Sequence, residues 1–172
     1  AKCLLYSFKP SENYRGISPR SKEVRFMKNL STEFNRISWF FSACIEQFRY
    51  VGNDNKRLLK IPAFAHSLAY NQYLKHFHMS LNLLKQGEKM WTNFLKSSRM
   101  QGQYVENLYT HYMKRSTFQF RLCLDDILHL TEEVPLGNDP LYIGIVKKTK
   151  NLFQLIQQLD QAIYHIIRAI SL

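Results

Sequence analysis

An apolar repeat with a seven-residue period is the feature of this sequence that most restricts its fold. It proceeds in alternating steps of three and four residues through Met27, Leu30, Phe34, Ile37, Phe41, Cys44, Phe48 and Val51. A strand alternates every two residues, whereas this period is that of a helix packed along one face. The repeat therefore predicts an amphipathic helix over 19–51. Pro19 suits its first turn after a Ser18 cap, Ser21 is a second candidate cap, and Gly52 marks the predicted end.

Three more segments carry the same period. The second comprises Tyr70, Leu74, Phe77, Leu81, Leu84, Glu88, Trp91 and Leu95. The third comprises Val105, Tyr109, Tyr112, Ser116, Phe120, Cys123, Ile127 and Leu130, with one extra residue near Ser116. The fourth comprises Ile145, Thr149, Leu152, Ile156, Leu159, Ile163, Ile166 and Ile170. These repeats predict helices over 63–97, 103–132 and 140–171, the last with Asp139 as its cap and Pro140 at its first position.

The lengths and connections of these helices predict how they pack. Each has about 30 residues and would be roughly 45–50 Å long. Short connections make consecutive helices antiparallel neighbours. The expected fold is therefore all-α, an up-down-up-down antiparallel four-helix bundle over 19–172, preceded by an extended basic and aromatic arm over 1–18. A chain of 172 residues has room for one such domain.

The charge balance favours an anionic partner. Lys and Arg number 24 against 13 Asp and Glu, a net charge of +11. Nucleic acid, an anionic membrane surface and an acidic protein all fit this balance. The expected topology gathers cations at the end where 19–51 begins and 63–97 ends. The predicted phosphate- or anion-binding residues are Arg20, Lys22, Arg25, Lys28, Lys89, Lys96 and Arg99. The alternative is that these long side chains only solvate helix faces.

Several large apolar side chains point away from the expected core on a helical wheel. The predicted partner-binding residues are Trp39, Met79, Leu83, Met90 and Phe94. A second apolar stripe on a bundle helix implies a cover, which would be the arm, another copy of the chain or another protein. The alternative for Trp39 is an ordinary single exposed apolar residue.

Sequence patterns of catalysis and cofactor binding are missing. Glycine-rich phosphate loops, nucleophile elbows, zinc-protease motifs and haem-attachment motifs do not occur. Asp125, His129 and Glu133 share one helical face but are interpreted as a solvated charged face, not a metal site. Cys44 and Cys123 lie on the repeats and are interpreted as core residues. We therefore expect no catalytic residue, no metal, no cofactor and no small-molecule substrate.

The sequence thus favours a non-enzymatic structural or adaptor subunit of a larger assembly. It would dock through its outward apolar stripe and its basic end, on other proteins or by self-association. The alternative is a basic helical module that binds the backbone of nucleic acid with little sequence specificity. Three cysteines without paired spacing favour a reducing intracellular compartment such as cytosol, nucleus or organelle matrix.

Overall fold

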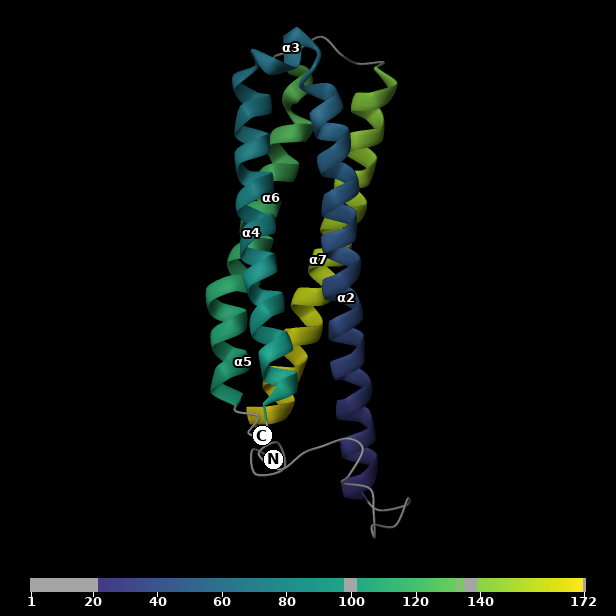
Figure 1. The fold of residues 1–172 in the computed structure, drawn as a ribbon, viewed down its shortest axis with the longest axis vertical. Coiled ribbons are helices and arrows are strands. Elements are labelled where there is room, and N and C mark those ends of the chain that lie inside the picture. The colour runs from purple at the N-terminus through teal and green to yellow at the C-terminus, as the bar shows by residue number, and fades with distance from the viewer. Residues whose placement is uncertain (1–21, 98–101, 133, 135–138, 172) are drawn as a thin grey trace.

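The structure, a computed structural model, describes residues 22–97, 102–132, 134 and 139–171. Every regular element among these residues is a helix, and the long helices lie side by side along the long axis of the molecule (Figure 1). The prediction of an all-α chain built from long packed helices is confirmed. The predicted arm over 1–18 and the start of the first helix lie outside the described residues.

The first helix is longer than predicted. Helix α2 spans Lys22–Leu58 and buries the repeat from Met27 to Val51. The prediction that it ends at Gly52 is wrong, because buried Asn55 and Leu58 extend the steps of three and four past the glycine. A Cβ atom at Gly52 would lie 3.9 Å from the ring of Phe77, which is an ordinary contact distance, so no close neighbour requires a glycine there.

The second segment is broken where the prediction had one helix over 63–97. A single turn, α3 (Pro62–Ala65), is followed by α4 (Leu68–Lys96). The side chain of Ser67 accepts a hydrogen bond from the backbone N–H of Tyr70 at 3.1 Å. This cap pairs a backbone donor that a new helix start would otherwise leave unpaired. A separate helix, α4, can therefore start after Ser67.

At every second position of the predicted repeat, α4 buries the preceding residue instead of the predicted one. The buried positions include Tyr73, Ser80, Gly87 and Phe94, here named the core row. The residues that follow them were predicted to be buried and are half-buried or exposed instead. They are Leu74, Leu81, Glu88 and Leu95, here named the outer row. Hydrophobicity alone favoured the outer row, but small and aromatic side chains fit the close contacts of the core row.

The third segment contains the extra residue that its repeat indicated, but two turns earlier than predicted. It consists of α5 (Gly102–Leu108), a π-helical turn η1 (Tyr109–Met113) and α6 (Lys114–Leu128), followed by the 3-10 turn η2 (Leu130–Glu132). Buried Leu108 and Met113 are five residues apart, which is the spacing of a π turn. The inserted residue turns the next part of the helix so that Ser116, Phe120 and Cys123 face the core.

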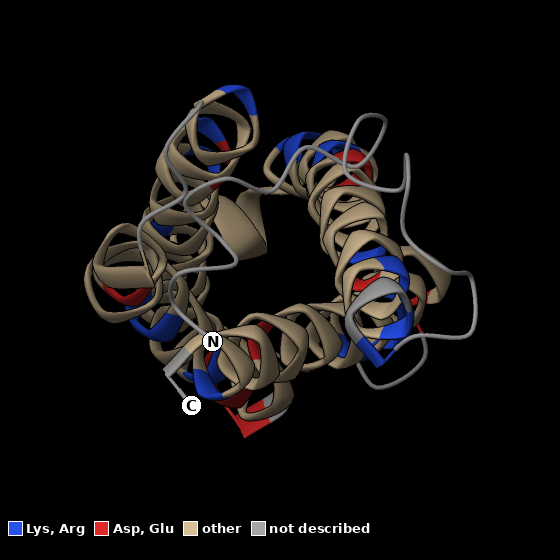
Figure 2. Cartoon of the chain, turned by 90° about the horizontal axis from the view of Figure 1, so that it is seen from below, with Lys and Arg blue, Asp and Glu red and all other residues tan. Residues whose placement is uncertain are grey.

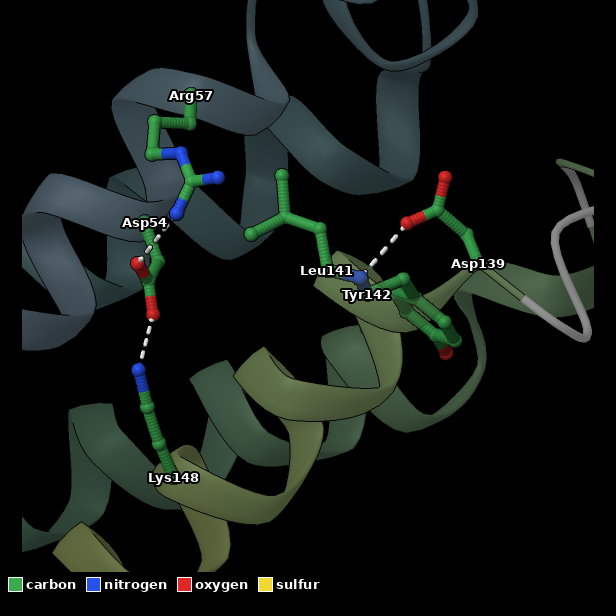
Figure 3. Close-up of polar contacts among 6 residues, drawn as sticks. All are labelled: Asp54, Arg57, Asp139, Leu141, Tyr142 and Lys148. Carbon is green, nitrogen blue, oxygen red and sulfur yellow. Dashed lines mark hydrogen bonds and ion pairs between the residues drawn. The ribbon is translucent and has the colours of Figure 1, made fainter.

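Helix α7 (Pro140–Ser171) begins as the sequence predicts. The Oδ1 atom of Asp139 accepts hydrogen bonds from the backbone N–H groups of Leu141 at 2.9 Å and Tyr142 at 3.2 Å (Figure 3). On the same helix Lys148 Nζ lies 2.6 Å from Asp54 Oδ2 of α2, and Arg57 lies 3.7 Å from the other oxygen (Figure 3). These contacts join α2 to α7 near the upper end.

The helices do not pack equally against all neighbours. Contacts are most extensive between α4 and α6 and between α2 and α7, and they are sparser between α2 and α4. Asp160 of α7 accepts hydrogen bonds from Tyr109 at 3.0 Å and Thr117 at 2.8 Å, which joins α7 to the third segment. None of the helices in the described part of the chain combines the length and apolar character that a membrane crossing needs.

Candidate functional site

A groove of about 630 Å³ separates α2 from α4 in the upper part of the molecule. Its apolar lining comes from both helices and comprises Ile45, Phe48, Leu59, Leu74, Phe77 and Leu81. Phe48 and Phe77 are buried and their rings form an edge-to-face pair with centroids 5.2 Å apart. Such pairs are more stabilising than burial alone, so the deep wall of the groove is firm. Ile45, Leu74 and Leu81 are only half-buried and leave apolar surface open to solvent.

Small side chains on the core row bring α4 close to its neighbours. Ser80 Oγ donates to the carbonyl of Ser116 at 2.9 Å, and Ser116 Oγ donates to the carbonyl of Ser80 at 2.8 Å. A Cβ atom at Gly87 would lie 3.5 Å from that of Tyr112 in η1 and 3.7 Å from the ring of Phe41 on α2. The core row is therefore filled by close contacts, whereas Leu74 and Leu81 of the outer row border the groove.

Below the groove, α2 and α4 come together. Trp91 Nε1 donates to Ser38 Oγ at 2.9 Å, and Ser38 Oγ donates to the carbonyl of Phe34 at 3.1 Å. The ring of Phe34 also packs edge-to-face on Trp91 and Phe94, with centroids 5.5 Å and 5.6 Å away. This aromatic cluster closes the lower end.

Above the groove, buried hydroxyl groups of α4 close the other end on Asn55. Tyr70 donates to the backbone carbonyl of Asn55 at 3.0 Å, and Tyr73 donates to Asn55 Oδ1 at 2.9 Å. Burial raises the pKa of the Tyr73 hydroxyl well above its usual value, so it remains a donor. Asn55 also lines the groove, and among the described residues its Nδ2 atom has no hydrogen-bond acceptor. A buried amide without a partner is costly, and it offers a donor beneath the apolar wall.

Charged side chains form the rim of the groove. They are Glu46, Arg49 and Lys56 from α2, and Lys85 and Glu88 from α4, with His78 as a further polar residue. Glu46 is engaged locally, because its Oε1 accepts from the Tyr50 hydroxyl at 3.0 Å and lies 3.9 Å from Arg49. Lys89 and Lys96 are exposed and lie on the same face of α4 as Lys85, at spacings of four and eleven residues. Cations therefore flank the groove on both sides and continue below it.

No counterpart exists in the comparisons. No protein-family model, curated protein or solved structure matches this chain. A function for the chain therefore depends on the geometry of its own residues.

Trp39 points away from the core, as the helical wheel predicts. Its side chain is 61% exposed and its ring lies edge-to-face on Phe40 at 5.2 Å. Spacings of three and four residues place Trp39, Ser42 and Glu46 on one face of α2. Ser42 and Glu46 line the groove, so Trp39 extends the same face below it. Its contact with a partner stays a prediction.

The predicted outward stripe of α4 is only partly exposed. Met79 is 38% exposed, whereas Leu83 and Met90 are half-buried. The prediction that Phe94 points outward is wrong, because it is 2% exposed and packs on Phe34 and Trp91. The wheel was centred on the outer row, and the shift of the buried face to the core row carried Phe94 inside.

The predicted anion-binding residues lie at the lower end wherever the structure describes them. Lys22, Arg25 and Lys28 are exposed on the first turns of α2, and Lys89 and Lys96 are exposed near the end of α4. Figure 2 shows Lys and Arg on several helices around this end, with Asp and Glu among them. The remaining two, Arg20 and Arg99, lie outside the described residues. Binding of anions there stays a prediction.

A polar cluster joins α4 to α6 on the flank away from the groove. His76 Nδ1 lies 2.9 Å from Gln119 Oε1, and its Nε2 lies 3.8 Å from Asp126 Oδ2. Burial raises the pKa of the Asp126 carboxyl, an effect that nearby His76 partly offsets. Among the described side chains Oδ2 of Asp126 has no hydrogen-bond donor. This carboxylate is therefore poorly compensated in its charged form.

The residues with metal-binding or nucleophilic chemistry do not form a cluster. In the described part of the chain, no three His, Cys, Asp or Glu side chains come together to hold a metal ion. His129 Nδ1 lies 2.7 Å from the carbonyl of Asp125 in its own helix, and Glu133 lies outside the described residues. Cys44 and Cys123 are buried, and burial raises the pKa of Cys44 to about 12. A thiol with such a pKa is a poor nucleophile at neutral pH.

The groove was not predicted from the sequence, because the repeat placed Leu74 and Leu81 in the core. One signal for it was nevertheless present. Ser80 and Gly87 stand seven residues apart on α4, each one position before a residue of the predicted repeat. Small residues at such spacing indicate close approach to another helix, and the row beside them then turns toward a wider gap.

Proposed function

We propose that this chain is a non-enzymatic structural or adaptor subunit of a larger assembly, which docks another protein on the face shared by α2 and α4. The observation that supports this best is the groove, in which half-buried Ile45, Leu74 and Leu81 leave apolar surface uncovered between cationic rims. Contiguous apolar surface bordered by polar residues is typical of protein-binding sites.

Trp39 supports the same face. Tryptophan is enriched among the residues that contribute most to protein association. At 61% exposure on the groove side of α2, it is available as an anchor below the groove. Met79 adds a smaller exposed apolar surface on the other flank of α4. Self-association of the chain through that surface would be independent of docking on the groove.

In this proposal the helical segments form an up-down-up-down antiparallel bundle. Residues 1–18 form an arm that leaves the end at which α2 begins. The change of colour along the rods in Figure 1 and the short connections between them support this order. The arm would then start on the same end as the cations at the bottom of α2 and α4.

A second candidate function is binding of nucleic acid through backbone contacts. The observation in its favour is the group of exposed cations at the lower end, which includes Lys22, Arg25, Lys89 and Lys96. Binding through such residues is largely independent of sequence and weakens steeply with salt. The apolar groove has no role in this alternative, which therefore predicts that groove variants bind normally.

Purification of the tagged full chain from its native source, with and without nuclease treatment, tests the proposal. We expect a fixed set of proteins to remain bound after nuclease treatment and to be lost from Trp39→Ser. Phe118→Ser is the matched control, because Phe118 is 57% exposed and lies on α6, away from the groove. A chain that purifies alone, or that loses its partners equally in both variants, would refute docking on this face. Loss of all partners to nuclease would favour the second candidate.

A further inference from the structure

The groove points to one kind of occupant. We infer that it binds an amphipathic α-helix of another protein, in which acidic residues flank a row of apolar side chains on both sides. This inference rests on the proposed docking function and names the partner of that same face. Three properties of the groove support it: its length, its two walls and the distribution of its charges.

The length of the groove matches a helix of a few turns. Its lining extends over 42–59, which comprises part of α2 and the residue after its end, and over 74–88 on α4. At 1.5 Å per residue these segments are about 21–26 Å long. A helix of about 14–17 residues has the same length, and it would present anchors at positions i, i+3 or i+4, and i+7.

The walls of the groove suit a helix because they are themselves two neighbouring helices. Ile45 stands on the α2 side, and Leu74 and Leu81 stand on the α4 side, seven residues apart. Side chains seven residues apart lie almost directly above one another along a helix, so these walls form ridges. The apolar row of a third helix fits between such ridges.

The charged residues on the rims of the groove indicate which charge the flanks of the partner helix should carry. Arg49 and Lys56 stand on the α2 rim, and Lys85 stands on the α4 rim. Glu46 lies 3.9 Å from Arg49, so these two charges offset each other, and Glu88 stands on the α4 rim with Lys85. One further cation therefore remains on each rim, Lys56 on α2 and Lys85 on α4. A linear amphiphile such as a fatty acid carries its charge at one end, whereas these cations border the groove on both sides. Carboxylates along both flanks of a helix complement that arrangement.

The same charges argue against occupants from this chain. The arm over 1–18 carries Lys2, Lys9 and Arg15 against Glu12, so cationic rims would repel it. A symmetric dimer through this face would bring together two copies of a rim in which Arg49, Lys56 and Lys85 outnumber Glu46 and Glu88. The partner is therefore a different protein.

Asn55 adds a polar contact to this apolar site. It lines the groove, is 3% exposed, and its Nδ2 has no acceptor among the described residues. An acceptor in the apolar row of the partner helix would satisfy this donor. Such a contact would favour helices that carry a polar residue at that one position.

A designed peptide tests the inference directly. The probe is a labelled helical peptide of about 16 residues, with leucines at every third or fourth position and glutamates on both flanks. Its binding to the full chain is measured by fluorescence anisotropy at low and moderate salt. Two control peptides replace every flanking glutamate by lysine or every leucine by serine. We expect only the acidic, leucine-containing peptide to bind.

Two variants of the chain alter the groove by different means. Gly52→Leu would fill the groove without changing any charge, since the space beside Gly52 is bounded only by Phe77 at 3.9 Å. Lys56→Glu with Lys85→Glu reverses one cation on each rim. Each should weaken binding of the acidic peptide by about tenfold or more. The reversed rim should also bind the lysine-flanked peptide. The matched control, Lys147→Glu with Lys150→Glu, makes the same charge change on exposed positions of α7 and should leave affinity within about twofold.

The outcomes separate the inference from the proposed function. Binding of the serine peptide as strongly as the leucine peptide would overturn the inference in favour of a simple polyanion surface, as would an unchanged affinity in Gly52→Leu. No binding of the acidic peptide would also overturn it. If native partners are still released by Trp39→Ser in that case, the docking function stands and only the helical partner is wrong. Circular dichroism of each variant establishes that it is folded.

Discussion

The core row and the outer row of α4 stand one residue apart along the same helix, yet they meet different surroundings. Ser80 and Gly87 of the core row contact Ser116 and Tyr112 closely, and Phe94 is 2% exposed. The outer row faces the groove or solvent and keeps its leucines half-buried or exposed. The difference teaches that closeness of approach, and not hydrophobicity, decided which face α4 buries. Leu74 and Leu81 of the outer row border the groove instead.

Replacement of one residue of each row near the lower end by alanine should give the largest difference in the free energy of unfolding. Phe94→Ala should lower the free energy of unfolding by about 3–5 kcal/mol, because it leaves a cavity among Phe34, Trp91 and Tyr104. Leu95→Ala should cost about 1 kcal/mol or less, since Leu95 is 36% exposed. Urea unfolding followed by circular dichroism measures both. Equal losses would show that the two rows are equally buried.

Replacement of Gly87 on α4 and of Gly52 on α2 by leucine should give the next largest contrast. Gly87→Leu should destabilise the fold by about 2–3 kcal/mol, because Tyr112 and Phe41 already lie within contact distance of a Cβ atom there. Gly52→Leu should be neutral or stabilising by about 0.5–1 kcal/mol, since leucine favours helix and enters the groove. The same unfolding experiment compares them. A strongly destabilised Gly52→Leu would mean that the groove has no room for a side chain.

The hydrogen bond between Tyr73 and Asn55 should couple the effects of replacing the two residues on the free energy of unfolding. Tyr73→Phe should cost about 1–2 kcal/mol, because Asn55 Oδ1 loses its donor. Asn55→Leu should have a similar cost, since the Tyr73 hydroxyl then lacks its acceptor. The double variant should lose clearly less than the sum, because no unpaired atom of this pair is left in the core. A double-mutant cycle by urea unfolding measures this, and strict additivity would contradict the contact.

The smallest effect is expected at Asp126, on the flank that joins α4 to α6. Burial raises the pKa of this carboxyl above its ordinary value of 3.8, while His76 and His129 act to lower it and Asp125 to raise it. An acid with a raised pKa favours folding when protonated, so this stabilisation is present below pH 3.8 and is lost as the pH rises through the folded-state pKa. Asp126→Asn should therefore raise the thermal midpoint slightly at pH 7 and leave it unchanged at pH 3.5. Scanning calorimetry at the two pH values measures this, and a lower midpoint at pH 7 would show that the pair with His76 dominates.

Local patterns in the sequence predicted the elements well. The spacing of apolar residues predicted the four helical segments, and Asp139 with Pro140 predicted where α7 begins. The additional residue in the third repeat predicted a local irregularity, which is the π turn of η1. These features depend on interactions within a few residues of the chain, which is why spacing alone reveals them.

The candidate site could not be predicted in the same way. A helical wheel gives the direction of a side chain only relative to an assumed core, and the core of α4 was assumed from its leucines. Trp39 was placed outward correctly because α2 has only one apolar row that fits. Phe94 was placed outward wrongly because α4 has two rows, and its leucines outweighed the small residues Ser80 and Gly87 that mark the buried row.

By itself, then, the sequence determined that the chain forms long amphipathic helices with a cationic surface, because periodicity and charge are properties of each segment alone. Only the tertiary structure decided that Ser80 and Gly87 are buried and that Leu74 and Leu81 border a groove. That choice depends on the fit between α4 and the third segment, where Ser116 stands 36 positions from Ser80 in the chain. The reciprocal hydrogen bonds of Ser80 and Ser116 form only when the two helices come into contact, so they are a property of the tertiary structure and not of either segment alone.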